Sequence, residues 1–212
     1  RSPGAVVDLA GAGGINLVRG SILVSTGSGS TALAIHDSAR TAIQHVTLLA
    51  RGAGSTALSV DATTGVTDVT VSSTIIRGGS LDVSSVGIMT GTTQLVLESS
   101  AYRVAGVAGA GPSTHGANHI SAEPIFVNEG GGDLHQAPGS PTIDAGTALG
   151  IATDIDGQPR SIGPQPDIGA DEAGAPAREP TRSGRGKGAR GRAEASAQPA
   201  PLRGWRRAPT RL

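Results

Sequence analysis

The amino-acid sequence predicts an all-β fold, a right-handed parallel β-helix of about four to five coils with about 26 residues in each coil. The first observation is a repeat, because positions 26 residues apart carry similar side chains. The second is the local pattern, in which short runs of β-branched residues alternate with polar residues and end at glycine. An α-solenoid has a similar period, but its apolar spacing is 3.6 residues rather than two.

Three columns of residues define the predicted register. They are Leu17, Ile43, Val69 and Leu95; then Ser21, Thr47, Ser73 and Ser99; then Leu23, Leu49, Ile75, Ala101 and Val127. Stacked coils share a core and pair their backbones, so residues of one column should lie above one another. We expect the hydroxyls to bond to neighbouring coils and Ile75 to lie inside the core. Exchange of Ser73 for threonine should then be nearly neutral.

The chain divides into three segments. Residues 1–107 form the coils, residues 108–172 form a C-terminal closing region that should pack on the end of the same stack, and residues 173–212 form a basic tail. Residues 1–172 carry seven arginines and fifteen acidic residues, whereas residues 173–212 carry ten basic and two acidic residues. The two parts therefore differ strongly in charge although the whole chain is neutral.

The tail is rich in Gly, Ala, Arg and Pro and should be disordered, because it has almost no apolar residues to bury. Its positive charge suits binding to an anionic polymer. Two alternatives are that the tail is a linker to a further domain, or that it results from out-of-frame translation of GC-rich DNA. Nucleic-acid binding is disfavoured, because Trp205 is the one aromatic residue near the basic run.

The composition limits location only weakly. No apolar run approaches the roughly 20 residues of a membrane-spanning helix. The chain contains no cysteine, which excludes a disulfide scaffold and a thiolate metal site. It begins with Arg1 and shows no signal sequence, so we expect that N-terminal residues are missing.

Four motifs between residues 120 and 172 occur in a characteristic order. They are ISAEPIFVN (120–128), GSPTIDAG (139–146), TDIDGQPR (153–160) and PDIGADE (166–172). With the coils, they resemble bacterial pectate-lyase-like β-helix proteins of the choice-of-anchor Q group. The resemblance implies a secreted or cell-surface protein with an extracellular location, and it implies no specific reaction.

Catalysis is not favoured by the carboxylates of the coils. β-Helix lyases and glycosidases need clustered acids on neighbouring coils, yet Asp61 and Asp68 lack acidic neighbours at the 26-residue step. We therefore favour a non-catalytic scaffold with structural, adhesive or glycan-contacting roles. The alternative is the C-terminal part of a polysaccharide lyase or glycoside hydrolase whose active site lies in missing N-terminal coils.

Two groups of residues are candidate binding sites. Arg51, Arg77 and Arg103 share the 26-residue step and would form a ladder for an acidic polysaccharide or cell-wall polymer, unless they splay into water. Asp154 and Asp156 resemble the start of a Ca²⁺ loop but lack its later ligands, so Asx turns are the alternative and no cofactor is required.

His45 shares its register with inward-facing positions. We expect a local slip that turns Val46 inward and His45 outward. The sequence does not specify an oligomeric state.

Overall fold

A computed structural model describes residues 4–11, 14–38, 40–103, 105–108, 113–115 and 118–174. They belong to one compact unit, Arg1–Ala177. The predicted disordered basic tail lies, from residue 175 onward, outside the described residues. Within the described part, no helix is long and apolar enough to cross a membrane.

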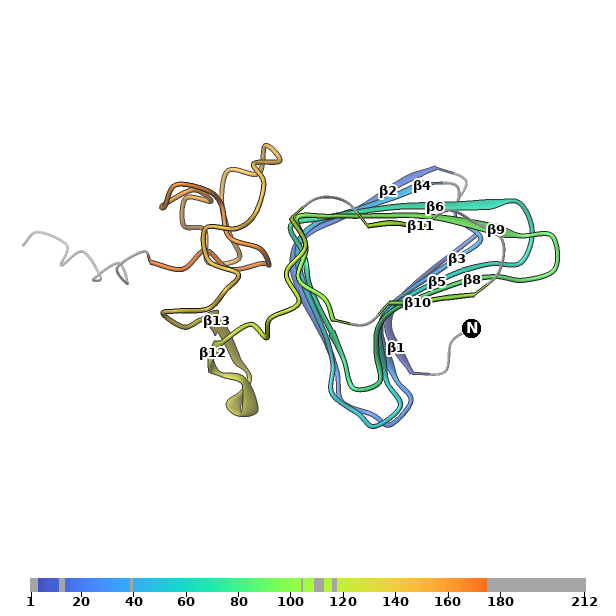
Figure 1. The fold of residues 1–212 in the computed structure, drawn as a ribbon, viewed down its shortest axis with the longest axis horizontal. Coiled ribbons are helices and arrows are strands. Elements are labelled where there is room, and N and C mark those ends of the chain that lie inside the picture. The colour runs from blue at the N-terminus through green and yellow to red at the C-terminus, as the bar shows by residue number, and fades with distance from the viewer. Residues whose placement is uncertain are drawn as a thin grey trace, which may run out of the picture. The chain divides into compact units, whose positions relative to one another are not determined.

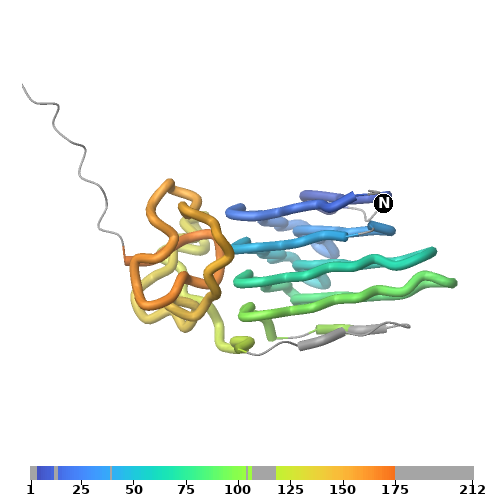
Figure 2. Tube along the Cα trace, turned by 90° about the horizontal axis from the view of Figure 1, so that it is seen from above, coloured from blue at the N-terminus to red at the C-terminus, as the bar shows by residue number. Residues whose placement is uncertain are grey.

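The described residues form a parallel β-solenoid of about four turns, in which successive coils stack on one another (Figures 1 and 2). One sheet has the order β1 (Ala5–Ala10), β3 (Thr31–His36), β5 (Thr56–Ala62), β8 (Leu81–Gly87), β10 (Ala105–Ala108). The other has the order β11 (Ser113–His115), β9 (Thr92–Glu98), β6 (Val66–Ser72), β4 (Arg40–Ala50), β2 (Ile15–Ser25), with β7 (Ile75–Gly78) also beside β4. All of these pairs are parallel, as the sequence predicted.

The C-terminal segment, residues 120–174, is mostly irregular. It contains one antiparallel pair, β12 (Phe126–Asn128) and β13 (Asp133–Gln136). A short 3-10 helix, η1 (Glu129–Gly131), joins these two strands. Backbone groups and apolar side chains of this segment contact the solenoid at several points.

The interior of the solenoid is filled by stacked aliphatic residues. Leu23 pairs with Leu48, and Leu48 pairs with Ile76, in successive coils. Ile43, Val71 and Leu97 form a second interior column. Tyr102 is the one buried ring in this cluster, so branched aliphatic side chains supply nearly all of the packing.

The predicted register is correct between β6 and β9, in the third and fourth coils, and it is wrong between β2 and β4 and between β4 and β6. Val69 pairs with Leu95, a step of 26. However, Ile43 pairs with Val71, a step of 28, and Leu17 pairs with Ala42, a step of 25. Because side chains alternate between faces, an odd slip turns a residue over; Leu17 therefore points outward and is 49% exposed.

The physical reason is that the corners differ in length and compensate one another. Seven residues (62–68) lie between Asp61 and Val69. Their partners in the previous coil, His36 and Thr41, have only four residues (37–40) between them. At the next corner the difference is reversed: two residues (79–80) lie between Gly78 and Leu81, whereas five (51–55) lie between their partners Ala50 and Thr56. The gain and the loss cancel, so the average period conceals both.

The hydroxyl column is displaced by one residue. The positions that bond to neighbouring coils are Thr74, whose Oγ1 accepts from Val46 N at 3.4 Å, and Ser100, whose Oγ accepts from Thr74 N at 3.2 Å. Ser73 and Ser99 instead have positive φ angles of 49° and 43°. They occupy the left-handed position of a tight corner that Gly20 and His45 occupy in the first two coils, with φ angles of 53° and 49°.

Two further predictions about the columns need correction. Ala101 pairs with Ile120, not Val127, because the intervening loop is shorter than one coil; Val127 is in β12 and is 57% exposed. Ile75 is buried, but on the outer face of the coil, in a second cluster with Leu49, Leu134 and Ile168. The interior position belongs to Ile76.

Candidate functional site

The C-terminal segment packs against the outer face of the coils at the corner that follows β6. Gly169 N donates to Ser73 O at 2.8 Å, and Ala170 N donates to Thr47 Oγ1 at 3.1 Å. Thr147 N donates to Ser73 Oγ at 2.8 Å. The segment therefore covers the side of several coils, whereas the sequence suggested that it would close the end of the stack.

His45 lies at the centre of this contact. It points out of the coil while Val46 points in, as predicted, but it is fully buried beneath the C-terminal segment. Its Nδ1 lies 3.2 Å from Asp167 O and its Nε2 lies 3.1 Å from Thr147 O. Burial and the charge of Arg160 lower the pKa of His45 to about 4, although the two carbonyls act in the opposite direction. We favour the neutral ring, which donates to one carbonyl only.

The three predicted arginines gather at one corner of the solenoid, but they do not form a regular ladder. The backbone partner of Arg77 in the preceding coil is Leu49, so Arg51 lies beyond that strand pair. Together with Glu123 and Glu129, the three arginines line a depression of about 170 Å³. We call these five residues, together with Asp82, the arginine corner.

Each arginine of this corner is paired with an acid. Asp82 Oδ2 lies 3.5 Å from Arg77 Nη1, and Asp82 Oδ1 lies 3.1 Å from Arg103 Nη2. Arg51 Nε lies 3.3 Å from Glu129 Oε1. The corner therefore carries three positive and three negative side chains, and it presents no net charge of its own.

Glu123 occupies a specific place between two arginines. Its Oε2 lies 3.4 Å from Arg77 Nε and 3.4 Å from Arg103 Nη1. Arg77 is 95% buried, whereas the side chains of Arg103 and Glu123 are 42% and 59% exposed. Burial lowers the pKa of Arg77, and the hydrogen bond to Asp82 raises the pKa of Arg103. The exposed carboxylate of Glu123 is thus held between one buried guanidinium group, that of Arg77, and one partly exposed guanidinium group, that of Arg103.

A second group of charged residues surrounds His135 on β13. Its Nδ1 lies 2.6 Å from Asp133 Oδ1, and its Nε2 lies 2.7 Å from Asp156 Oδ2. These carboxylates, Asp133 first, raise the pKa of His135 to about 9. One potential ligand atom each from His135, Asp156 and Asp171 lies within 4.8 Å of the others. We call these three residues the histidine–aspartate cluster.

The structure separates the roles of the two predicted Ca²⁺ ligands. Asp154 is buried, and its Oδ1 accepts from Asp156 N at 3.0 Å and from Gln158 N at 2.8 Å. Its Oδ2 accepts from Glu172 N at 3.2 Å. Asp154 thus orders the surrounding loops in the manner of an Asx turn, whereas the carboxylate of Asp156 contacts His135.

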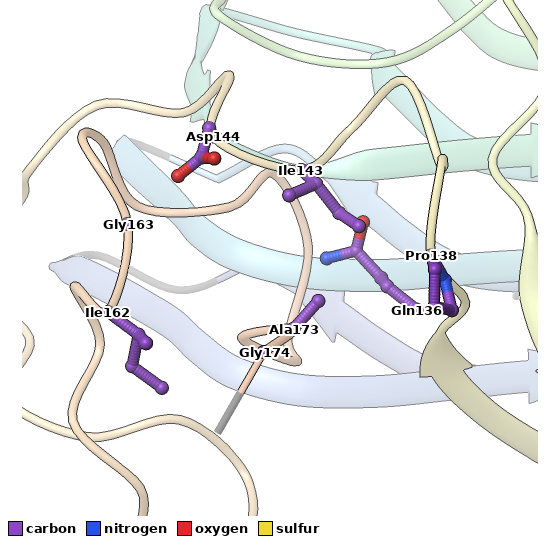
Figure 3. A pocket seen from close by; sticks show the side chains of 8 residues that line it. All are labelled: Gln136, Pro138, Ile143, Asp144, Ile162, Gly163, Ala173 and Gly174. Atoms are coloured by element: carbon purple, nitrogen blue, oxygen red, sulfur yellow. The ribbon is translucent and has the colours of Figure 1, made fainter. Parts of the chain in front are cut away.

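Another depression, of about 350 Å³, lies beside this region (Figure 3). Its lining is mostly apolar, and Asp144 is the one titratable residue in it; the lining residues are Gln136, Pro138, Ile143, Asp144, Ile162, Gly163, Ala173 and Gly174. The amide of Gln136 already bonds to Asp167 Oδ2, Ile168 O and Asp171 O. This depression therefore offers little chemistry.

Several acids of the coils have structural partners. Asp37 Oδ1 accepts from Thr63 N at 2.6 Å and caps the next corner. Asp61 lies 3.2 Å from His36, and Asp68 lies 3.7 Å from Arg40.

Sequence reasoning missed both the histidine–aspartate cluster and the acids of the arginine corner. Asp133 and His135 are two residues apart on one strand, a spacing that places their side chains on the same face. That signal was present in the sequence. The approach of Asp156 and Asp171 was not, because it depends on how two irregular loops fold back onto β13.

The fold and these sites define the class of protein: a parallel β-solenoid with a C-terminal segment packed on its side. No family model, no curated protein and no solved structure matches this chain.

Proposed function

We propose that this chain is a non-catalytic β-solenoid scaffold, secreted or exposed at the cell surface, that contacts an acidic polysaccharide at the arginine corner. The resemblance of its C-terminal motifs to the choice-of-anchor Q group supports the location. The position of Glu123 supports the ligand. Its carboxylate lies between Arg77 and Arg103 in the way that a uronate carboxylate of a glycan would.

The geometry favours exchange of Glu123 for a ligand carboxylate. Arg77 Nε is buried, and Glu123 Oε2 lies 3.4 Å from it without forming a well-aligned hydrogen bond, so a better-placed carboxylate would accept from this N–H. Arg77 is otherwise fixed by hydrogen bonds to Ile76 O and Ala122 O. The Glu123 side chain is largely exposed, and loss of its ion pair with the partly exposed Arg103 costs about 1 kcal/mol or less, while a ligand carboxylate would take over the contact with Arg77. The arginine side chains are thus already in position to bind a carboxylate, and Glu123 is the group that a ligand carboxylate would displace.

Binding should be weak and sensitive to salt. Each uronate replaces an existing carboxylate, so the net gain per site is small and affinity depends on several sugars along the solenoid. Exposed charges are screened over about 8–10 Å at physiological ionic strength. Neutral glycans should not bind at this corner.

The test is calorimetric titration with oligogalacturonate at low and physiological salt. Arg103→Ala should weaken binding about two- to fivefold, as expected for an exposed ion pair, and Glu123→Gln should strengthen it by a similar factor. Arg40→Ala is the matched control, because Arg40 is an exposed arginine on another part of the coil. Equal losses for Arg40→Ala and Arg103→Ala, or weaker binding by Glu123→Gln, would exclude this corner as the site.

The same samples test the non-catalytic part of the proposal. Unsaturated-product absorbance and reducing-end release are measured on pectate, polygalacturonate, alginate and neutral glycans, with and without Ca²⁺. We expect no turnover. Reproducible turnover that a single Asp or Arg substitution abolishes would replace the scaffold by the lyase or hydrolase alternative.

A further inference from the structure

The histidine–aspartate cluster combines residues from three parts of the C-terminal segment. His135 is on β13, Asp156 is in the 153–159 loop, and Asp171 follows the loop that contacts the solenoid. Their potential ligand atoms lie within 4.8 Å of one another. Ligands at about 2.0–2.2 Å from one Zn²⁺ ion lie about 3.3–3.6 Å apart, so small shifts of the exposed His135 and Asp156 side chains would bring the three atoms to coordination distance. We propose that these three side chains bind a divalent transition-metal ion, with Zn²⁺ as the best fit.

The surroundings of His135 orient its ring for this role. Asp133 Oδ1 lies 2.6 Å from Nδ1, so a proton on Nδ1 is held by a carboxylate and Nε2 faces the cluster. Metal-binding histidines commonly have such a carboxylate behind them, because it fixes the ring orientation and increases the basicity of the ligating nitrogen. Asp171 is similarly fixed, since its Oδ2 accepts from Gln136 N at 2.6 Å.

A separate observation comes from Gln158, which lines the same depression as the cluster. Its Oε1 is buried and has no hydrogen-bond partner among the described residues. A buried acceptor without a donor costs about 1–3 kcal/mol. A cation in the depression, or a water molecule bound to it, would satisfy this oxygen. Gln158 is thus a candidate for a further direct or water-mediated contact.

The local charge also favours a cation. The carboxylates of Asp154 and Asp156 lie close enough to Asp171 to repel its negative charge. The compensating positive side chains nearby are His135 and Arg160. A divalent ion bound through Asp156 and Asp171 would reduce this repulsion.

The identity of the metal follows from the ligand types. One imidazole nitrogen with two carboxylates suits Zn²⁺ or a similar transition metal, whereas Ca²⁺ takes six to eight oxygen ligands. The ion takes the place of the proton on Nε2, and that proton is released to the solvent. The bound ion would join β13 to the two loops, and its role would be structural.

The experiment uses the full chain, freed of any affinity tag and treated with a chelator, titrated with Zn²⁺ and separately with Ca²⁺ in a calorimeter. We expect one Zn²⁺ per chain, much tighter than Ca²⁺, and a higher thermal midpoint because the ion binds only the folded state. His135→Ala and Asp156→Asn should each weaken Zn²⁺ binding at least tenfold. Asp156 is exposed, so its substitution should leave folding intact.

His119→Ala is the matched control, because His119 is an exposed histidine on another segment, beside Tyr102. It should bind Zn²⁺ as the wild type does. Equal binding by wild type and Asp156→Asn, or no preference for Zn²⁺ over Ca²⁺, would show that the cluster is an internal ion pair only. Glycan binding at the arginine corner is measured with chelator present, so the two proposals fail independently.

Discussion

Gly169 and Ile75 are in such close contact that a β-carbon on Gly169 would lie 2.7 Å from Ile75 Cδ1 and 3.1 Å from Thr47 Oγ1. The φ angle of Gly169 is +112°, which L-residues rarely adopt. The backbone of the C-terminal segment therefore approaches the solenoid more closely than any other residue type would permit. This contact brings Ile168 onto the outer apolar cluster of Leu49 and Ile75.

Gly169→Ala should therefore destabilise the protein by about 2–4 kcal/mol, through overpacking and backbone strain together. Denaturant unfolding followed by circular dichroism measures the change. Gly150→Ala is the control, because Gly150 has a φ of +71° and no atom within 4 Å of an added β-carbon. It should cost about 1 kcal/mol. Equal effects of the two substitutions would mean that the close contact contributes nothing.

Ser73→Thr should not be neutral, in contrast to the expectation from the sequence. A β-branched residue at a φ of 49° is strained, and we expect a loss of about 1–3 kcal/mol. Ser84→Thr, within β8, provides the comparison and should change stability by less than about 0.5 kcal/mol. Thermal melts of the two variants decide between these outcomes, and a stable Ser73→Thr would argue against the left-handed corner.

Asp82→Asn should cost about 3–5 kcal/mol, because it leaves Arg77 buried beside a neutral partner. Burial alone raises the pKa of Asp82, but hydrogen bonds from Arg103 and Gly78 lower it further than that. Its stabilising contribution is therefore present above the unfolded pKa and is lost as the pH falls through the lower folded value. Asp68→Asn, which affects an exposed pair with Arg40, should cost less than about 1 kcal/mol. Similar losses for both variants in chemical denaturation would contradict the buried pair.

His45 should make the stability depend on pH. Its folded pKa of about 4 lies below the ordinary value of 6.5, so the unfolded chain binds a proton that the folded chain does not. The contribution of the neutral ring is complete above pH 6.5 and declines toward pH 4, by about 3 kcal/mol in total.

His45→Asn tests this dependence, because asparagine tolerates a positive φ and does not titrate. Unfolding free energies are compared for variant and wild type at several pH values between 4 and 7. The comparison is needed because the pKa values of Asp167 and Glu172 are raised by burial, and these groups shift stability in the opposite direction. The wild type should lose its advantage as the pH falls. An advantage that grows on acidification would mean that His45 is protonated between its two carbonyls.

The sequence by itself determined the class of fold. Alternating β-branched residues, glycine corners and a recurrent spacing are local properties, and they were sufficient to predict stacked parallel strands with an aliphatic interior. The outward turn of His45 was also predictable, because Val46 is the better residue for the core. The C-terminal motifs contained Asp156 and Asp171 of the candidate metal site, and Asp156 was singled out from them, whereas His135 lies outside all four motifs.

The tertiary structure alone decided the register of the first coils, which residues are buried on the outer face, and which acids accompany the predicted site residues. Two corners that differ by three residues in opposite directions leave the mean period almost unchanged, so Ile43 could not be matched to Val71 from spacing alone. His45 and the carbonyl of Asp167 are 122 residues apart. Whether an outward-facing histidine meets water or a buried carbonyl depends on where residues 120–174 pack. That choice follows from the summed apolar contacts of Ile75, Ile168 and Leu134, which no local pattern encodes.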